Sequence, residues 1–354
     1  ITTYEWVQFE NFLILVIVFV FLFISVSLSL VRKKKIVRYL VNPFIFYRCL
    51  SRKIKFLKQF SIKPIFDKHK KTVRNILIVD CVFLVLFLCT VLLKGFDPSI
   101  TGTEKPMDFM MLNSVVVSGS NPPEDSWFSG MSVSYYYFGY WIMACMALLS
   151  GIATSVSYNL SIALIVGISG SVMFSFIMAL TLRDGKKFYT SLFVGFVGCY
   201  LLLLSSNLSV VWILLDLCNC VPDKVFDWYA GTDYQHISIT KNMRPGDHWW
   251  WWNSTRVINT FSPDGVSLDC TIQEFPFFSV LLGDLHPHLM GMPFILTSFV
   301  LTYCVYLRIK SSKGYLDPKI LVFVILLGIL VAVVGFINYW DLAITVSCVL
   351  LFTF

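Results

Sequence analysis

The sequence predicts an all-α protein, a polytopic bundle of transmembrane helices, and two observations support this fold class. The chain has 354 residues, of which 57% are hydrophobic and 14% charged, whereas a soluble domain is about 45–50% apolar and about 25% charged. The apolar residues also form runs of about 20, the length that a helix needs to cross a bilayer core of about 30 Å. We therefore expect an integral membrane protein that crosses the bilayer several times.

Six runs reach this length, and a seventh begins at Leu342. The six complete runs cover residues 11–31, 75–93, 159–182, 189–215, 289–307 and 320–337. We expect residues 1–354 to form a single transmembrane domain. Because the chain begins without Met and stops inside an apolar run, we also expect it to be part of something longer.

Basic residues are concentrated between the first two spans. Residues 32–74 contain fifteen Lys or Arg and one acid, Asp67. Such a block would suggest nucleic acid as a partner of a soluble protein, but beside transmembrane helices it indicates a cytoplasmic loop that meets anionic lipids. We therefore expect membrane lipids as partners, and no nucleic acid.

The loop charges also decide whether the apolar residues 134–151 cross the membrane. If they did, residues 183–187, with three basic side chains, would lie outside, and residues 216–274, with eight acids and four bases, would lie inside. Both placements oppose the positive-inside rule. We therefore expect a juxtamembrane helix within a first outer loop of residues 94–157. The second outer loop, residues 216–288, is expected to fold on the membrane surface with short helices.

This topology gathers polar clusters on the non-cytoplasmic face. Glu104 and Asp108 lie in the first outer loop, and an aromatic run begins at Tyr135. The clusters at residues 283–288 and 338–341 lie at the outer ends of two spans. Ionisable residues at membrane depth are costly, so they are functional candidates by default.

The residue types leave two interpretations open for each acidic cluster. Glu104 or Asp108 is either a general base that deprotonates an acceptor hydroxyl or, for Asp108, a cap of the helix that follows. Asp284, His286 and His288 have the ligand types of a metal site, and alternate residues of an extended backbone share one face. Their other interpretation is a hydrogen-bonded turn that caps the next helix.

Five motifs occur in a specific order. They are Glu-Lys-Pro-Met-Asp at residues 104–108, Tyr-Tyr-Tyr-Phe-Gly at 135–139, Glu-Phe-Pro-Phe-Phe at 274–278, Gly-Asp-Leu-His-Pro-His at 283–288 and Asn-Tyr-Trp-Asp at 338–341. This set resembles the uncharacterised "YYY" polytopic membrane-protein family of archaea and Chloroflexi. The resemblance covers roughly residues 75–345 and does not extend to the basic loop. The family is distantly similar to GT-C glycosyltransferases, an analogy at the level of fold.

The resemblance implies a GT-C-like fold and a glycosyltransferase that moves a sugar from a polyprenyl-phosphate donor to an acceptor on the non-cytoplasmic face. Asp108 or Glu104 would be the general base. Asp284, His286 and His288 would hold the donor phosphate, directly or through a divalent ion such as Mg, Mn or Zn. The other substrate-binding residues would be Tyr135, Tyr136, Tyr137, Trp340 and Asp341.

Two further functions compete with this interpretation. The chain could be a non-enzymatic membrane subunit that holds lipids or partner proteins in a larger assembly. A transporter ranks third. It would need charged residues near mid-bilayer and broken helices in matched halves, and the sequence shows neither. An enzyme needs its carboxylates and imidazoles to converge, whereas a scaffold would leave them in separate local hydrogen bonds.

Overall fold

A computed structural model describes residues 63–205, 255–311 and 318–353, together with a few positions between 215 and 224. The expected first span, residues 11–31, lies outside the described residues, as does most of the basic loop. The chain divides into two compact units, Ile1–Leu77 and Ile78–Phe354, and the second contains nearly everything described.

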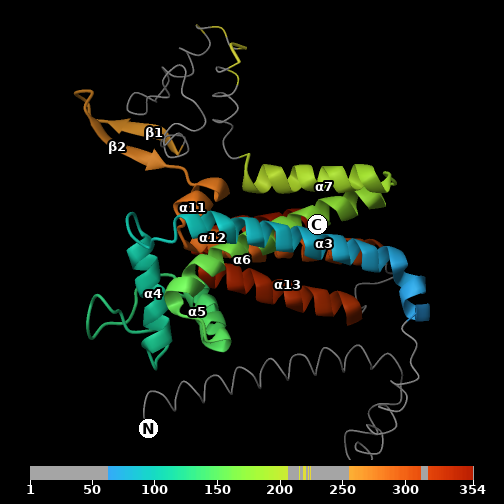
Figure 1. Cartoon of the computed structure of the whole chain (residues 1–354), viewed down its shortest axis with the longest axis horizontal. Helices are drawn as coiled ribbons and strands as arrows, with labels where there is room; N and C mark the ends of the chain where they lie inside the picture. The colour runs from blue at the N-terminus through green and yellow to red at the C-terminus, as the bar shows by residue number, and fades with distance from the viewer. Residues whose placement is uncertain are drawn as a thin grey trace, which may run out of the picture. The chain divides into compact units, whose positions relative to one another are not determined.

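Helices dominate the described residues (Figure 1). Four of them contain a segment long and apolar enough to cross a membrane. These four are α3 (Lys63–Phe96), α6 (Thr154–Arg183), α12 (Pro287–Ser311) and α13 (Pro318–Ile337). The others are α4 (Lys105–Val117), α5 (Phe138–Ser150), α7 (Phe188–Leu203), α11 (Pro276–Leu282) and α14 (Tyr339–Thr353). The helical membrane bundle that the sequence predicts is therefore confirmed, with α3 beginning twelve residues before the expected span.

The second outer loop differs from the expectation of short helices alone. Strands β1 (Arg256–Phe261) and β2 (Ser267–Ile272) pair antiparallel as a hairpin. Its turn contains Gly265 at φ +78°, a conformation that suits glycine. Two short runs with β-branched residues on either side of a Pro-Asp-Gly turn favour such a hairpin. The all-α fold class is therefore confirmed, and the expectation of short helices is wrong for this part of the second outer loop.

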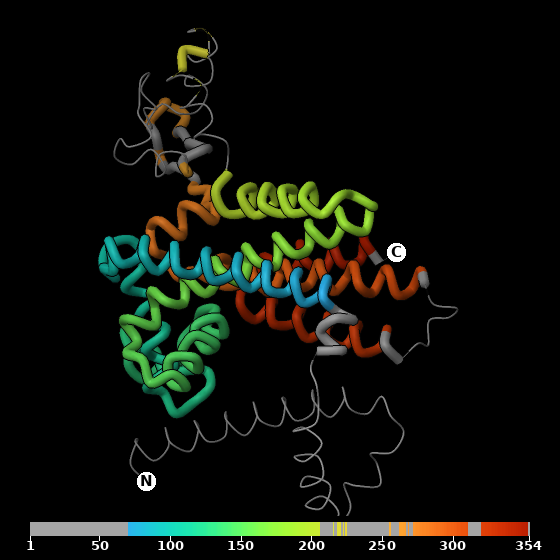
Figure 2. Tube along the Cα trace, turned by 45° about the vertical axis from the view of Figure 1, so that its right-hand side comes forward, coloured from blue at the N-terminus to red at the C-terminus, as the bar shows by residue number. Residues whose placement is uncertain are grey.

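Helix α5 is too short to cross a bilayer. Its 13 residues span about 20 Å at 1.5 Å per residue, against about 30 Å of hydrocarbon. In both views α4 and α5 lie together at one end of the long helices (Figures 1 and 2). This length and position support the prediction that residues 134–151 do not cross.

The long helices share two ends, and the polar clusters lie at one of them. The N-terminal part of α6 meets the segment before α12 through Tyr158, whose hydroxyl donates to the Gly283 carbonyl oxygen at 3.2 Å. At the opposite end, the guanidinium of Arg183 lies 5.8 Å from the ring centroid of Tyr303 on α12. The first outer loop and the described residues directly before α12 are thus at one end, and the basic termini of α6 and α12 are at the other, in agreement with the loop charges. Which end faces the cytoplasm stays a prediction.

Small residues on α6 allow its neighbours to approach closely. A Cβ added at Gly167 would lie 2.9 Å from the Phe83 ring of α3, and one at Gly170 would lie 2.3 Å from a Leu86 methyl group. Small residues at helix contacts are typical of membrane bundles, where packing rather than the hydrophobic effect holds helices together. The bundle therefore forms a fixed frame for the loops at its polar end.

Candidate functional site

The first turn of α4 positions the two acids of the first outer loop. Glu104 is the N-cap residue, and Pro106 stands in the first turn, where its missing N–H is tolerated. Asp108 therefore lies inside the helix, and the interpretation of Asp108 as the cap is wrong. Its side chain is fully buried and accepts a hydrogen bond from the Tyr140 hydroxyl of α5.

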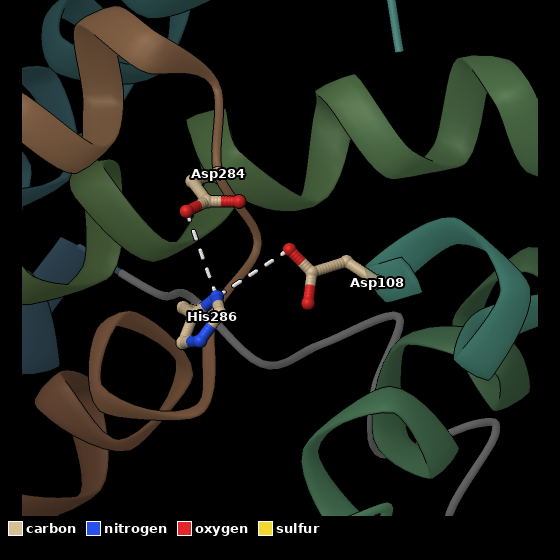
Figure 3. Close-up of side chains that lie close together, drawn as sticks. All are labelled: Asp108, Asp284 and His286. Atoms are coloured by element: carbon tan, nitrogen blue, oxygen red, sulfur yellow. Dashed lines mark ion pairs between the residues drawn. The ribbon is translucent and has the colours of Figure 1, made fainter. Parts of the chain in front are cut away.

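His286 connects acids from both outer loops (Figure 3). Its Nδ1 lies 3.6 Å from an oxygen of Asp108 and 3.5 Å from an oxygen of Asp284, while its Nε2 lies 2.9 Å from Glu104 Oε2. Asp108 projects from α4, whereas Asp284 and His286 project from the segment between α11 and α12. We call Glu104, Asp108, Asp284 and His286 the acid–histidine cluster.

The cluster contains buried polar atoms without hydrogen-bond partners among the described residues. They are Asp108 Oδ2, Asp284 Oδ1 and His286 Nδ1. Asp108 is fully buried and Asp284 is 2% exposed, and a buried polar group without a partner costs about 1–3 kcal/mol. Such atoms indicate a place for water, a cation or a substrate group.

Burial and charge act together on the titration of the cluster. Burial raises the pKa of Asp108 to about 6, although His286 opposes the shift. Burial alone would lower the pKa of His286, but Asp108 and Asp284 raise it to about 11. The same imidazolium holds the pKa of Asp284 below its usual range against the effect of burial. His286 is therefore a cation at neutral pH while no metal ion replaces its proton.

The structure divides the predicted metal ligands. Asp108, Asp284 and His286 offer atoms that all lie within 4.8 Å of one another. His288 turns elsewhere, because its Nε2 lies 2.9 Å from Glu274 Oε2 and 3.1 Å from Ser279 Oγ. The geometry thus favours Asp108 as the third candidate ligand in place of His288.

The predicted aromatic residues are only partly gathered. Burial, and next the nearby carboxylates of Asp108 and Glu104, raise the pKa of Tyr135 to about 12, so Tyr135 lies close to the cluster. Tyr136 packs on it with ring centroids 5.3 Å apart, and Tyr137 is the N-cap residue of α5. By contrast, Trp340 is 77% exposed, and no described contact ties it to the cluster.

Asp341 is not part of the acid–histidine cluster. One of its oxygens accepts a hydrogen bond of 2.9 Å from Asn338 and lies 3.3 Å from the place of a Cβ on Gly291. The rings of His286 and His288 are 5.5 Å apart. The predicted polar residues therefore do not all meet at one point, because Asp341 and His288 make contacts of their own.

The sequence model of one protein family, described as an uncharacterized membrane protein (DUF2298), matches residues 1–354. The chain belongs to the DUF2298 family. The match confirms an uncharacterised membrane-protein family, and it includes the basic residues 32–74 that the motif resemblance did not reach. Searches of the curated proteins and of the solved structures found no match.

Three residues of this DUF2298 chain contact the site although the sequence analysis did not predict them as site residues. Tyr140 donates to Asp108, and Tyr158 bridges the Gly283 carbonyl oxygen and the Leu285 N–H at 3.2 Å each. Lys94, at the end of α3, is 4% exposed and touches Gly283. Tyr140 stands in the aromatic run that the sequence singled out, whereas nothing in the sequence marks Tyr158 or Lys94 as buried beside the loop.

Proposed function

We propose that this chain is a membrane-embedded glycosyltransferase that moves a sugar from a polyprenyl-phosphate donor to an acceptor on the non-cytoplasmic face. The observation that carries the proposal is the convergence of Asp108, Asp284 and His286 from two outer loops at one end of the helical bundle. A scaffold would satisfy these groups by local hydrogen bonds, whereas three of their buried atoms have none among the described residues. Buried polar atoms without hydrogen bonds are costly and favour a site for a ligand.

Exposure separates the roles of the two acids. The Glu104 side chain is 60% exposed, so its carboxylate can meet an acceptor from the aqueous side. Asp108 is fully buried and would act by positioning and charging His286. In this assignment Glu104 is the general base, and Asp108 takes that role only if the loop opens.

The proposed step balances with the residues present. The acceptor oxygen forms a bond to the anomeric carbon, its proton passes to Glu104, and the bond from that carbon to the phosphate oxygen breaks. The polyprenyl phosphate leaves with the electron pair, and the imidazolium of His286 would stabilise its charge. Tyr135, Tyr136 and Tyr137 would form the wall that contacts the donor.

A divalent cation is a second way to stabilise the leaving phosphate. We propose Asp108, Asp284 and His286 as its ligands, since two carboxylates and one imidazole suit Mn or Zn, while Mg prefers oxygen alone. A metal ion on Nδ1 must displace the proton of His286, so its affinity should rise with pH. Binding of Mn²⁺ followed by electron paramagnetic resonance tests this: His286→Gln should abolish it and His288→Gln should not. Equal binding by both variants would contradict the ligand set.

Transfer itself is tested with the purified full chain and radiolabelled undecaprenyl-phosphate hexoses, by following the release of label from the lipid phase. Glu104→Gln should lower the rate by about 10²–10⁴-fold, the usual contribution of a general base. Glu124→Gln, an exposed acid of the same loop, is the matched control. If Glu104→Gln and the control release sugar equally fast, Glu104 is not the base.

The role of Asp108 needs a different measurement. Asp108→Asn should lower the rate and also displace the alkaline limb of the pH–rate profile towards lower pH, because the imidazolium loses a neighbouring charge. A purely structural role would lower the amount of active enzyme and leave the profile in place. If no hexose is released by the wild type from any donor, the glycosyltransferase proposal fails.

A further inference from the structure

Lys94 is a buried cation at the polar end of α3. Its side chain is only 4% exposed, and among the described residues it makes no hydrogen bond and no ion pair. The charged groups that act on it most are Lys105, which repels it, and Asp97, which is exposed. Because a largely buried residue keeps its charge away from bulk water, an anion from outside the chain would stabilise this position.

Lys94 also lines a cavity of about 300 Å³. The cavity is further lined by the apolar residues Val91 and Leu160, and by Ser155 and Val156 of the first turn of α6. Helix α6 begins at this wall, and its N-cap residue, Ala153, provides no side-chain hydrogen bond. The N–H groups of Val156 and Ser157 already donate to the Ala153 carbonyl oxygen. Ser155 is therefore the lining residue of this first turn whose N–H, with the partial positive charge of the helix end, favours a phosphate.

Lys94 connects the cavity to the segment that carries Asp284 and His286. The Lys94 ammonium lies against Gly283, since a Cβ added there would be 2.2 Å from its nitrogen. Gly283 directly precedes Asp284, and its carbonyl oxygen accepts from Tyr158 of α6. An anion held at Lys94 would therefore lie beside the residue that directly precedes Asp284.

An apolar path leads from the cavity along α3. Leu84 and Leu88 are more than half exposed and share a helix face with Val91 and Gly95, by their spacing of three or four residues. In a membrane this face meets the lipid chains. A phosphate at Lys94 could thus belong to a molecule whose hydrocarbon tail lies along α3.

We propose that the cavity between Lys94 and the N-terminus of α6 binds the phosphate group of the lipid-linked donor. The proposal rests on the proposed function for the sugar on that phosphate. Two features carry it: the positive charge of Lys94, a residue only 4% exposed, and the N-terminus of α6, which has no side-chain cap. The binding of an isoprenoid phosphate itself does not depend on transfer.

The test measures binding of farnesyl phosphate to the purified full chain in detergent by isothermal titration calorimetry. Lys94→Met removes the charge and keeps most of the length of the side chain. It should weaken binding by about 10- to 100-fold, the range expected for a hydrogen bond to a charged group. Lys186→Met is the control, because that lysine pairs with Asp184 at the opposite end of α6.

Two further ligands identify the source of the phosphate. Farnesol, which lacks the charge, should bind Lys94→Met and wild type alike, and inorganic phosphate should bind far more weakly than farnesyl phosphate. Inorganic phosphate that binds as tightly as farnesyl phosphate would overturn the assignment to a lipid. Unchanged binding of farnesyl phosphate by Lys94→Met would overturn the site itself.

The unliganded variant gives a second measurement. Since Lys94→Met replaces an uncompensated buried charge by an apolar chain, it should raise the melting temperature without ligand. A lower melting temperature would mean that Lys94 has a structural partner, which contradicts the proposal. Farnesyl phosphate binding without sugar transfer would leave the phosphate site intact and end the glycosyltransferase proposal. Normal transfer by Lys94→Met would leave the glycosyltransferase proposal intact and end the proposed phosphate site.

Discussion

Replacing Asp108 by Asn should change the titration of His286, and the distances give the size of the effect. The Asp108 carboxylate lies 3.6 Å from His286 Nδ1. Two unit charges at that distance interact by about 4–5 kcal/mol at an effective dielectric constant of about 20. Removing one of them should therefore lower the pKa of His286, which is about 11 in the wild type, by about 3. Asp284 remains and keeps part of the elevation.

The assay is a pH titration followed by NMR of the protein labelled at its histidine rings. The chain has only five His, and the spectrum of His286→Gln identifies the signal. Asp125→Asn is the control, because this acid of the same loop accepts hydrogen bonds from Trp127 and Phe128 N–H groups. The control should move the pKa of His286 by less than about 0.5. If Asp108→Asn also moves it by less than about 0.5, the ion pair does not exist in solution and the electrostatic reasoning fails.

Three other predictions concern stability and topology. Gly170→Ala should lower the melting temperature, because its Cβ would lie 2.3 Å from a leucine methyl group of α3, whereas Gly328→Ala, with nothing within 4 Å, should leave it equal or higher; equal losses would contradict the packing. Because the pKa of His286 is raised above its unfolded value, its stabilisation is complete below pH ~6.5 and is lost as the pH rises towards about 11. Chemical denaturation should therefore show stability falling between pH ~7 and ~9 in the wild type and less so in His286→Gln. Single Cys probes at Lys187 and Gln273 should react with an impermeant thiol reagent from opposite sides of the membrane, and labelling from one side would refute the topology.

The membrane helices were predictable because their signal is local and strong. An apolar run of about 20 residues has few alternatives to a transmembrane helix. The end of α7 shows the limit of this rule. The apolar run continues to residue 215, yet the helix stops at Leu203, since hydropathy measures the preference for lipid and does not locate the last hydrogen bond of a helix.

Composition also predicted which loops would share an end, but not which atoms would meet there. The charge rule placed the Glu104 and Asp284 loops on one face. It could not give the burial of Asp108, which depends on how α5 brings Tyr140 against the first turn of α4. Nor could it give the burial of Lys94, which looks in sequence like a flanking residue at the end of a span and in the structure packs against Gly283.

The fate of the two histidines shows how one boundary decides a ligand set. The prediction that Asp284, His286 and His288 share a face assumed an extended backbone through all of them. Helix α12 instead begins at Pro287, a position that proline favours because its ring fixes a helical φ. From that residue on, side chains advance by about 100° instead of alternating, so His288 leaves the face of His286 and meets Glu274 and Ser279. The third candidate ligand beside Asp284 and His286 is then Asp108 of the first outer loop. Because Pro287 starts the helix that turns His288 away, the site depends on Asp108.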